Sequence, residues 1–297
     1  MIDLLESVFE AFYLFLVLAV LGDIVVERSG VLNLGIDGFI VFSIALSYTA
    51  TVLYGPLPAL AIVIVCGILY AALISLFVNV LHLSHVLTGL VLNMAFYGLS
   101  VVIGELGAES ALELLSRRTL KPPLLLRWYH VLAIAVAVAV AVWLFLYKTR
   151  LGTAIRACGF NPRAAEHLGV KIWSTRSAAL IAGYAIISSA GYVYTLFYKA
   201  SWTTYTGIGY GFLALALAMA SLWHPLIAIA PVALFSYLER NQYVFQLSYG
   251  IPTHLLSMIP YLASIAFITA INASPLEKKL PIPRALGEVY FKEERAA

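Results

Sequence analysis

The fold is decided around one polar segment, Lys148–Arg176, which reads K-T-R-L-G-T-A-I-R-A-C-G-F-N-P-R-A-A-E-H-L-G-V-K-I-W-S-T-R. Asn161 is a good helix N-cap, and Pro162 follows at the first helical position, where its missing N–H group costs nothing. Gly169 stands where a helix of about seven residues would end. A second short helix is predicted just before it, at Gly152–Cys158. The sequence therefore predicts two short helices outside an apolar layer.

The same segment is strongly basic. It has one acid, Glu166, against six basic residues: Lys148, Arg150, Arg156, Arg163, Lys171 and Arg176. Lys and Arg collect in the cytoplasmic loops of membrane proteins. We therefore expect this segment on the cytoplasmic side of a membrane.

The composition excludes a soluble domain. Of the 297 residues, 62% are hydrophobic and 11% are charged, and the mean hydropathy is +0.95. A soluble domain of this composition would have no polar surface to show water. The net charge of +3 is small and is explained by the cytoplasmic side, so no nucleic-acid partner is expected. Cys66 and Cys158 lie in different predicted environments, so neither a disulfide nor a metal site is expected.

Apolar runs predict an all-α integral membrane protein with nine spans. A helix needs roughly 20 apolar residues to cross a bilayer. Runs of this kind cover 8–26, 35–53, 57–80, 86–105, 130–147, 173–197, 208–222, 225–243 and 252–271. The segment 207–222 either spans fully or is re-entrant. We expect a multi-pass protein of the cell membrane.

The loop charges predict how the spans are oriented. With the basic segment inside, the N-terminus falls outside and the C-terminus in the cytoplasm. The inside segments then hold 12 of the 18 Lys and Arg residues, and the outside segments hold six, which agrees with the positive-inside rule. Residues 1–271 form the predicted transmembrane domain, with 148–176 as its main cytoplasmic loop. Residues 272–297 are predicted to be a loose cytoplasmic tail.

An internal repeat is predicted at an offset of 169 residues. The matches at punctuating positions are Gly22 with Gly191, Gly38 with Gly207, Pro56 with Pro225, and His85 with His254. Spans 1–4 would correspond to spans 6–9, and five spans separate each from its mate. The two halves would then point in opposite directions across the membrane, as in many transporters. Coincidence in a sequence rich in Ala and Leu is the alternative.

Both halves of the repeat open on glycine-interrupted apolar sequence, at Gly30–Gly38 and Gly207–Gly211. Such breaks leave backbone polar groups free, and lipid tolerates this only where the break is buried or faces a cavity. Asn33 and Asp37 lie in the first break, and a carboxylate within the membrane is a candidate functional group. The alternative is structural: Asn33 caps the following helix and Asp37 suits its first turn.

Further polar and aromatic residues are candidates for a substrate pathway. Asn93 lies in the fourth span, where hydrogen bonding between helices is the commoner role of an amide. Possible stacking faces are Tyr48, Tyr97, Trp202, Tyr205 and Tyr210. The predicted substrate-pathway residues are Asn33, Asp37, Asn93, Trp202, Tyr205 and Tyr210.

The sequence contains no motif for catalysis. It lacks a phosphate-binding G-x-x-x-x-G-K-[ST] loop, a G-x-S-x-G nucleophile elbow and an H-E-x-x-H zinc motif. We therefore expect a chain that is not an enzyme, binds no cofactor or metal, and cannot hydrolyse ATP alone.

Two motifs carry a resemblance to a known family. R-S-G-V-L-N-L-G-I-D-G, at Arg28–Gly38, and G-T-A-I-R-A-C-G-F-N-P-R-A-A-E-H-L-G-V, at Gly152–Val170, resemble stretches of the permease subunits of ABC transporters for nucleosides and simple sugars. The wider family includes branched-chain amino acid permeases. The resemblance covers about residues 20–271. Asp37 stands where the family more often has Glu, and Phe160 where a polar residue is common.

The resemblance implies one membrane half of an importer driven by ATP. The expected partners are a second, related but non-identical permease, two cytoplasmic ATPase subunits that use the ATP, and an extracellular binding protein. Nucleosides are the expected substrates, with simple sugars or branched-chain amino acids as alternatives. A secondary transporter working alone and a membrane scaffold that transports nothing are the other classes left open.

The resemblance also implies that the loop 148–176 couples the ATPase to transport. Arg156 and Arg163 are predicted to make polar contacts with the ATPase, and Ala164, Ala165 and Leu168 to pack against it. The remaining residues of the matched motif give the loop its shape: Gly159, Asn161, Pro162 and Gly169.

Overall fold

The computed structural model describes residues 8–114, 126–249 and 282–291, with Glu6 and six separate positions between 255 and 269. Within these residues every regular element is a helix. Five helical stretches are long and apolar enough to cross a membrane: Ile36–Tyr54, Pro56–Val80, His85–Ser110, Trp128–Lys148 and Ile172–Tyr198. The all-helical membrane architecture expected from the sequence is confirmed at this level.

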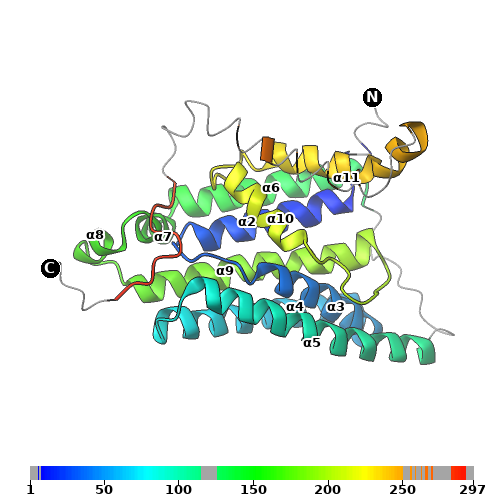
Figure 1. Ribbon diagram of the computed structural model, residues 1–297, viewed down its shortest axis with the longest axis horizontal. Helices are drawn as coiled ribbons and strands as arrows, with labels where there is room; N and C mark the ends of the chain where they lie inside the picture. The colour runs from blue at the N-terminus through cyan, green and yellow to red at the C-terminus, as the bar shows by residue number, and fades with distance from the viewer. Residues whose placement is uncertain are drawn as a thin grey trace.

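The centre of the bundle is α2, Ala11–Glu27, in which every residue is buried. It packs along α9, Ile172–Val193, and beside α6, Trp128–Lys148 (Figure 1). α2 and α9 are antiparallel, because the rings of Phe15 and Tyr194 lie 5.0 Å apart near one end while Val26 faces Gly183 near the other. With 17 residues, α2 is at the short limit for a membrane span.

A second layer consists of α3, Ile36–Tyr54, α4, Pro56–Ser75, and α5, His85–Leu114 (Figure 1). α4 and α9 each continue into one π-helical stretch, η1 at Leu76–Val80 and η2 at Tyr194–Tyr198. Gly38 allows α3 to approach α5 closely, since a Cβ there would overlap the backbone of Asn93. α5 runs on to Leu114, so the span predicted at 86–105 is longer than expected.

The predicted span 208–222 is wrong as a full span. The structure has α10 at Tyr210–Ala220, 11 residues, and at 1.5 Å per residue this helix is only about 16 Å long. The backbone then turns through positive φ angles at Leu222 and Trp223, which end the helix. α11, Ile229–Tyr249, follows in place of the span predicted at 225–243. The span predicted at 252–271 lies outside the described residues apart from the separate positions, so nine spans stay a prediction.

Two short helices, α7 (Arg150–Phe160) and α8 (Pro162–His167), lie together at one end of the bundle (Figure 1). The start of α2 lies at the opposite end. α7 is two residues longer at each end than the predicted helix 152–158. The described part of the C-terminal region, 282–291, packs against the same end as α7 and α8, so this part is not the loose tail that was predicted.

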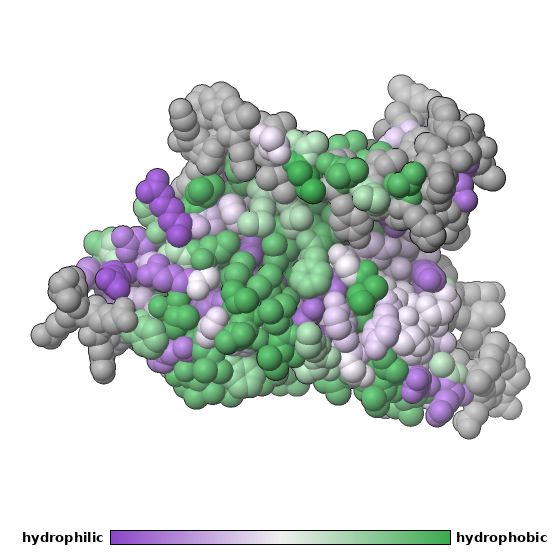
Figure 2. Space-filling model, in the orientation of Figure 1, coloured by the Kyte–Doolittle hydropathy of each residue, from purple (hydrophilic) through white to green (hydrophobic). Residues whose placement is uncertain are grey.

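The hydropathy of the surface also differs between the middle of the bundle and its α7–α8 end. A broad hydrophobic area covers the middle of the bundle, and hydrophilic residues gather at the end that holds α7 and α8 (Figure 2). Large apolar side chains on α5, among them Leu87, Met94 and Val102, are well exposed. A soluble monomer rarely exposes so much continuous apolar surface, whereas a membrane protein turns it to lipid or to another subunit.

Candidate functional site

The start of α10 is held by a carboxylate from another helix. Asp37, in the first turn of α3, accepts hydrogen bonds from the backbone N–H groups of Gly209 (3.0 Å) and Gly211 (2.6 Å). The first N–H groups of a helix have no partner within it, and the helix dipole favours a negative charge there. Asp37 therefore fits the first turn of its own helix, as expected, and also caps α10.

This junction lies deep in the bundle. The far end of α10 reaches the α7 end, where Arg28 Nε donates to the carbonyl oxygen of Trp223 at 2.8 Å. Because α10 is about 16 Å long, its start lies roughly half of a 30 Å hydrocarbon layer away from that end. A buried helix start near the middle of the membrane is a typical position for a transporter site.

Two side chains from α5 complete the polar group around Asp37. The Tyr97 hydroxyl donates to the Asp37 carboxylate, and Asn93 Oδ1 accepts from the backbone N–H of Gly38. Asn93 Nδ2 donates to the Tyr97 hydroxyl at 3.3 Å. Asn93 thus makes the bonds between helices that its place in a span suggested, and it also holds Tyr97 against Asp37.

Of the two predicted aromatic residues before α10, Tyr205 lies next to this group and Trp202 packs further along α5. The Tyr205 side chain is 47% exposed, and its ring meets that of Tyr97 edge-on at 6.2 Å. Trp202 packs on Gly104 of α5, where a Cβ would overlap the indole ring. Tyr205 is the predicted pathway aromatic that combines an exposed side chain with proximity to the Asp37 group.

Tyr210 points elsewhere, although it begins α10. Its ring packs against Phe12, Phe15 and Tyr194, and its hydroxyl donates to Glu239 Oε1 at 3.2 Å. Its surroundings are those of a core aromatic residue with a satisfied hydroxyl. The structure therefore does not bring it together with Asn93 and Tyr205.

Asn33 neither caps α3 nor joins the Asp37 group. The N-cap residue of α3 is Gly35, and no side chain caps it, so the predicted cap is wrong. Instead Asn33 Nδ2 donates to Asp23 Oδ1 at 2.8 Å, and Asn33 Oδ1 accepts from the Tyr184 hydroxyl. Asn33 is a buried link between the central helices α2 and α9.

Two acids of α2 escaped the sequence analysis. Asp23 and Glu27 are both fully buried and stand one helical turn apart. Glu27 Oε2 accepts from the Trp223 indole N–H at 2.6 Å, while Asp23 bonds Asn33. The sequence signal that could have found them is a pair of carboxylates four residues apart at the end of an apolar run. Membrane spans rarely carry acids without a role, so such a pair indicates candidate functional residues.

The α7–α8 segment folds as its capping residues predict. The Asn161 side chain accepts a hydrogen bond from the Ala164 N–H at 3.0 Å, and Pro162 opens the helix. Gly169 follows with φ +86°, a conformation that favours glycine. Gly159 lies against the turn after α2, where a Cβ would overlap the carbonyl oxygen of Arg28.

The predicted coupling residues fall into two groups. Arg156 faces its own chain, where Nε donates to the Leu146 carbonyl oxygen at 2.9 Å and the guanidinium lies 4.5 Å from the Tyr147 ring centroid. Ala165 is buried against Cys158 and Ile172. Of the residues predicted to contact the ATPase directly, Arg163, Ala164 and Leu168 are exposed, and Leu168 is 85% exposed.

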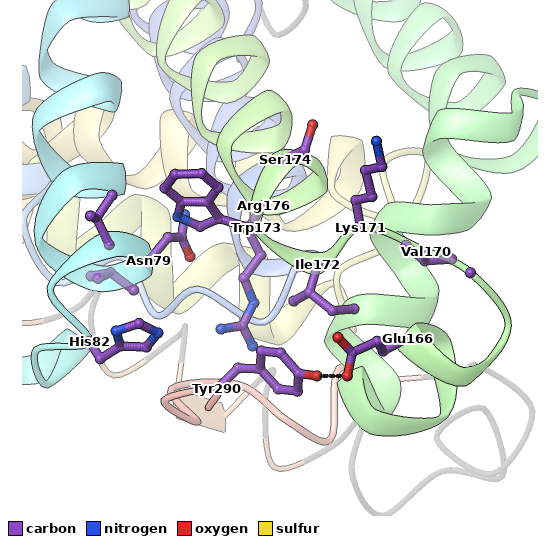
Figure 3. Close-up of a pocket in the computed structure, with 13 residues that line it drawn as sticks. Asn79, His82, Glu166, Val170, Lys171, Ile172, Trp173, Ser174, Arg176 and Tyr290 are labelled. Atoms are coloured by element: carbon purple, nitrogen blue, oxygen red, sulfur yellow. Dashed lines mark hydrogen bonds between the residues drawn. The ribbon is translucent and has the colours of Figure 1, made fainter. Parts of the chain in front are cut away.

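A cavity of about 610 Å³ opens beside α8. His82, after η1, lies on one side and Glu166 of α8 on the other, with Trp173 of α9 above Tyr290 (Figure 3). The Tyr290 hydroxyl donates to the Glu166 carboxylate. Burial and this carboxylate raise the pKa of Tyr290 to about 12, so its phenol is neutral and can donate at physiological pH.

Comparison with known proteins gives relatives along the whole chain. A permease of Haloferax volcanii, provisionally named for glucose ABC transport, is 26% identical, and the alignment covers 94% of each chain. The guanosine ABC transporter permease of Bacillus subtilis and the nucleoside ABC transporter permease of Lactococcus lactis are each 24% identical, again over 94% of both chains. No solved structure matches the chain significantly.

A family assignment agrees with these relatives. Residues 5–268 match the family described as "Branched-chain amino acid transport system / permease component". Such components work with ATPase and substrate-binding partners and are not enzymes themselves. The helical bundle and its hydrophobic surface fit a multi-pass membrane protein. The chain therefore belongs to this family, as a permease component of an ABC transporter.

Proposed function

We propose that the chain is one membrane half of an ATP-driven nucleoside importer. The observation that carries the proposal is the full-length similarity to two permeases named for guanosine and nucleoside transport. A nucleoside is uncharged and polyhydroxylated and carries an aromatic base. The group around Asp37, with Asn93, Tyr97 and the exposed ring of Tyr205, supplies matching polar and stacking partners.

The substrate path in this proposal passes the start of α10. Asn93 and Tyr205 both contact Tyr97, which bonds Asp37, and Trp202 packs on α5 at Gly104. The Asp37 carboxylate is occupied by three donors. Asp37 therefore shapes the path, and the amide and aromatic groups contact the substrate. Asn33 and Tyr210 support the surrounding helices from their own buried contacts. This chain binds no cofactor in the proposal, and ATP is used by the partner subunits.

The repeat of 169 residues is part of the proposal. Shifted by this offset, α2, α3 and α4 fall in turn on α9 with η2, on α10 and on α11. The equivalent pair α2 and α9 is antiparallel, as opposite orientation of two halves requires. The segments 8–10 and 282–291 lie at opposite ends of the bundle, in keeping with an outside N-terminus and a cytoplasmic C-terminus.

In the proposed complex, α8 enters a cleft of an ATPase subunit. Its exposed residues Arg163 and Ala164, with Leu168 just after it, would face the partner. Trp173, at the start of α9, is a further exposed apolar side chain at 55%. Large exposed apolar side chains at a polar end of the molecule are typical of a protein interface. A second permease, related but non-identical, completes the membrane part.

Replacing Leu168 with Asp is expected to release the ATPase, because a carboxylate would be buried in an apolar contact. We expect co-purification of ATPase with the permease to fall at least about tenfold, which corresponds to about 1.4 kcal/mol of binding free energy. Leu168→Met, which keeps volume and apolarity, is the control. Equal co-purification of the ATPase with the Leu168→Asp and Leu168→Met variants would contradict docking through this face.

Replacing Ala165 with a bulky residue or Pro162 with Gly should uncouple ATP hydrolysis from uptake through misplacement of α8, since both residues are buried.

The substrate class is tested by competition. Cells that express the complete importer take up labelled adenosine in the presence of excess guanosine, ribose, glucose or leucine. We expect guanosine to reduce the uptake and the other three compounds to leave it unchanged. Competition by leucine alone would overturn the nucleoside assignment. Competition by a sugar alone would favour the second candidate, sugar import, which the Haloferax volcanii relative supports.

A further inference from the structure

We infer that residues 282–291 form a strap that positions the α7–α8 segment on the helix bundle, so that movement of α8 reaches α2 and α9. This role rests on the proposed docking of an ATPase at α8. The contacts that define the strap are all within this chain and do not involve the ATPase. Those contacts join it to four separate parts of the structure.

The backbone of the strap is pinned at two points. Ala285 N–H donates to the carbonyl oxygen of Gly159 in α7, and Gly287 N–H donates to that of Gly30 in the turn after α2, both at 2.9 Å. Gly287 has φ +78° and Gly30 has φ +89°. The strap therefore ties α7 directly to the end of the central helix.

Arg176 adds a third connection, to α9. Its side chain is 1% exposed, and Nε donates to the Ser29 carbonyl oxygen at 3.3 Å while Nη1 donates to that of Glu288 at 3.2 Å. Hydrogen bonds from a charged donor are stronger than neutral ones. One arginine of α9 thus joins the turn after α2 to the strap.

Side chains of the strap reach the α7–α8 segment and η1. The Tyr290 hydroxyl bonds Glu166 of α8, as Figure 3 shows. The guanidinium of Arg284 lies 4.9 Å from the ring centroid of Phe160. Phe291 stacks on His82 after η1, with ring centroids 5.0 Å apart. Tyr290 also packs against the small cluster of Cys158, Ala165 and Ile172.

These contacts give the strap a mechanical role. α8 is short, and its own packing on the bundle consists of Pro162 and Ala165. A force on α8 passes through Tyr290 into the strap, and from there through Gly30 and Arg176 into α2 and α9. α2 and α9 form the buried centre of the bundle, and α10 packs on α2 while α3 packs on α9. The strap therefore links the docking helix to the helices that support the proposed path.

The test compares two truncations of the chain in the complete complex. Termination after Pro281 removes the strap, and termination after Phe291 keeps it and serves as the control. Hydrogen exchange of the α7 and α8 amides is expected to become about tenfold faster without the strap, since local opening costs less. Nucleoside uptake per ATP hydrolysed is expected to fall at least tenfold, with hydrolysis no longer raised by the binding protein.

Tyr290→Phe is the variant that leaves the fold intact. It removes the hydroxyl that donates to Glu166 and keeps the ring, so exchange in α8 should rise and uptake per ATP should fall, each by less than after truncation. Unchanged α8 exchange in both altered chains would overturn the strap. Faster exchange with unchanged coupling would overturn its positioning role. Failure of the proposed docking would be seen in a different experiment, the co-purification of ATPase with the Leu168→Asp variant. The strap contacts are measured by hydrogen exchange of the α8 amides.

Discussion

Replacing Asp37 with Ala is expected to abolish transport and to destabilise the permease. The substitution leaves the N–H groups of Gly209 and Gly211 and the Tyr97 hydroxyl without their common acceptor. A hydrogen bond to a charged group contributes about 1.5–3 kcal/mol, so the total loss should be about 3 kcal/mol or more. That is a large part of the 5–15 kcal/mol by which a typical protein is stable. Thermal unfolding in detergent and nucleoside uptake in cells measure the two effects.

Two further variants give this prediction its controls. Asp37→Asn keeps an acceptor oxygen but removes the charge at the start of α10, so it should lie between wild type and Asp37→Ala. Glu105→Ala removes an exposed acid of α5 and should change the free energy of unfolding by no more than about 0.5 kcal/mol. If Asp37→Ala were as stable and as active as Glu105→Ala, Asp37 would not hold α10.

Replacing Gly211 with Ala is the second change with a large expected effect. A Cβ at Gly211 would overlap the backbone of Asp37, and a backbone cannot move aside as a flexible side chain can. The methyl group would therefore force α3 and α10 apart and stretch the hydrogen bonds between them. We expect a loss of about 1–3 kcal/mol, as for other overpacked sites, and uptake at least tenfold lower.

Gly98→Ala is the matched control for Gly211→Ala. Gly98 is an exposed glycine of α5, and a Cβ there would meet nothing within 4 Å. Alanine favours a helix over glycine by about 1 kcal/mol, so Gly98→Ala should be neutral or more stable. The unfolding temperature of Gly211→Ala should therefore be clearly lower than that of Gly98→Ala. Equal temperatures and equal uptake would contradict close contact between α3 and α10.

The parts of the fold that were predicted correctly depend on local signals. Asn161, Pro162 and Gly169 specify α8 through bonds within a few residues, and the structure has the helix there. Long apolar runs likewise located the five stretches able to cross a membrane. The 11-residue length of α10 was missed because the apolar run 208–222 continues through its end. The turn is made by backbone angles at Leu222 and Trp223, which hydropathy does not report.

The candidate site was only partly predictable, since its bonds join distant parts of the chain. Asp37 was singled out as a carboxylate in a glycine-rich break, but its partners lie 172 and 174 residues away, so the sequence did not indicate them. Asn33 was expected to cap the next helix, and its partner Tyr184 is 151 residues away. The segment 282–291 was predicted as part of a loose tail, although its backbone is bonded to Gly30 and Gly159, which are far away in the sequence.

ATP dependence of nucleoside uptake tests the central claim most directly. Proteoliposomes would hold this permease with its second permease and ATPase subunits, with labelled adenosine and the binding protein outside. The proposed function predicts uptake with ATP and magnesium inside the vesicles and none with a non-hydrolysable ATP analogue. It also predicts no uptake driven by a proton or sodium gradient alone. Adenosine accumulation driven by such a gradient in the absence of ATP would contradict the claim that this chain is the membrane half of an ATP-driven nucleoside importer.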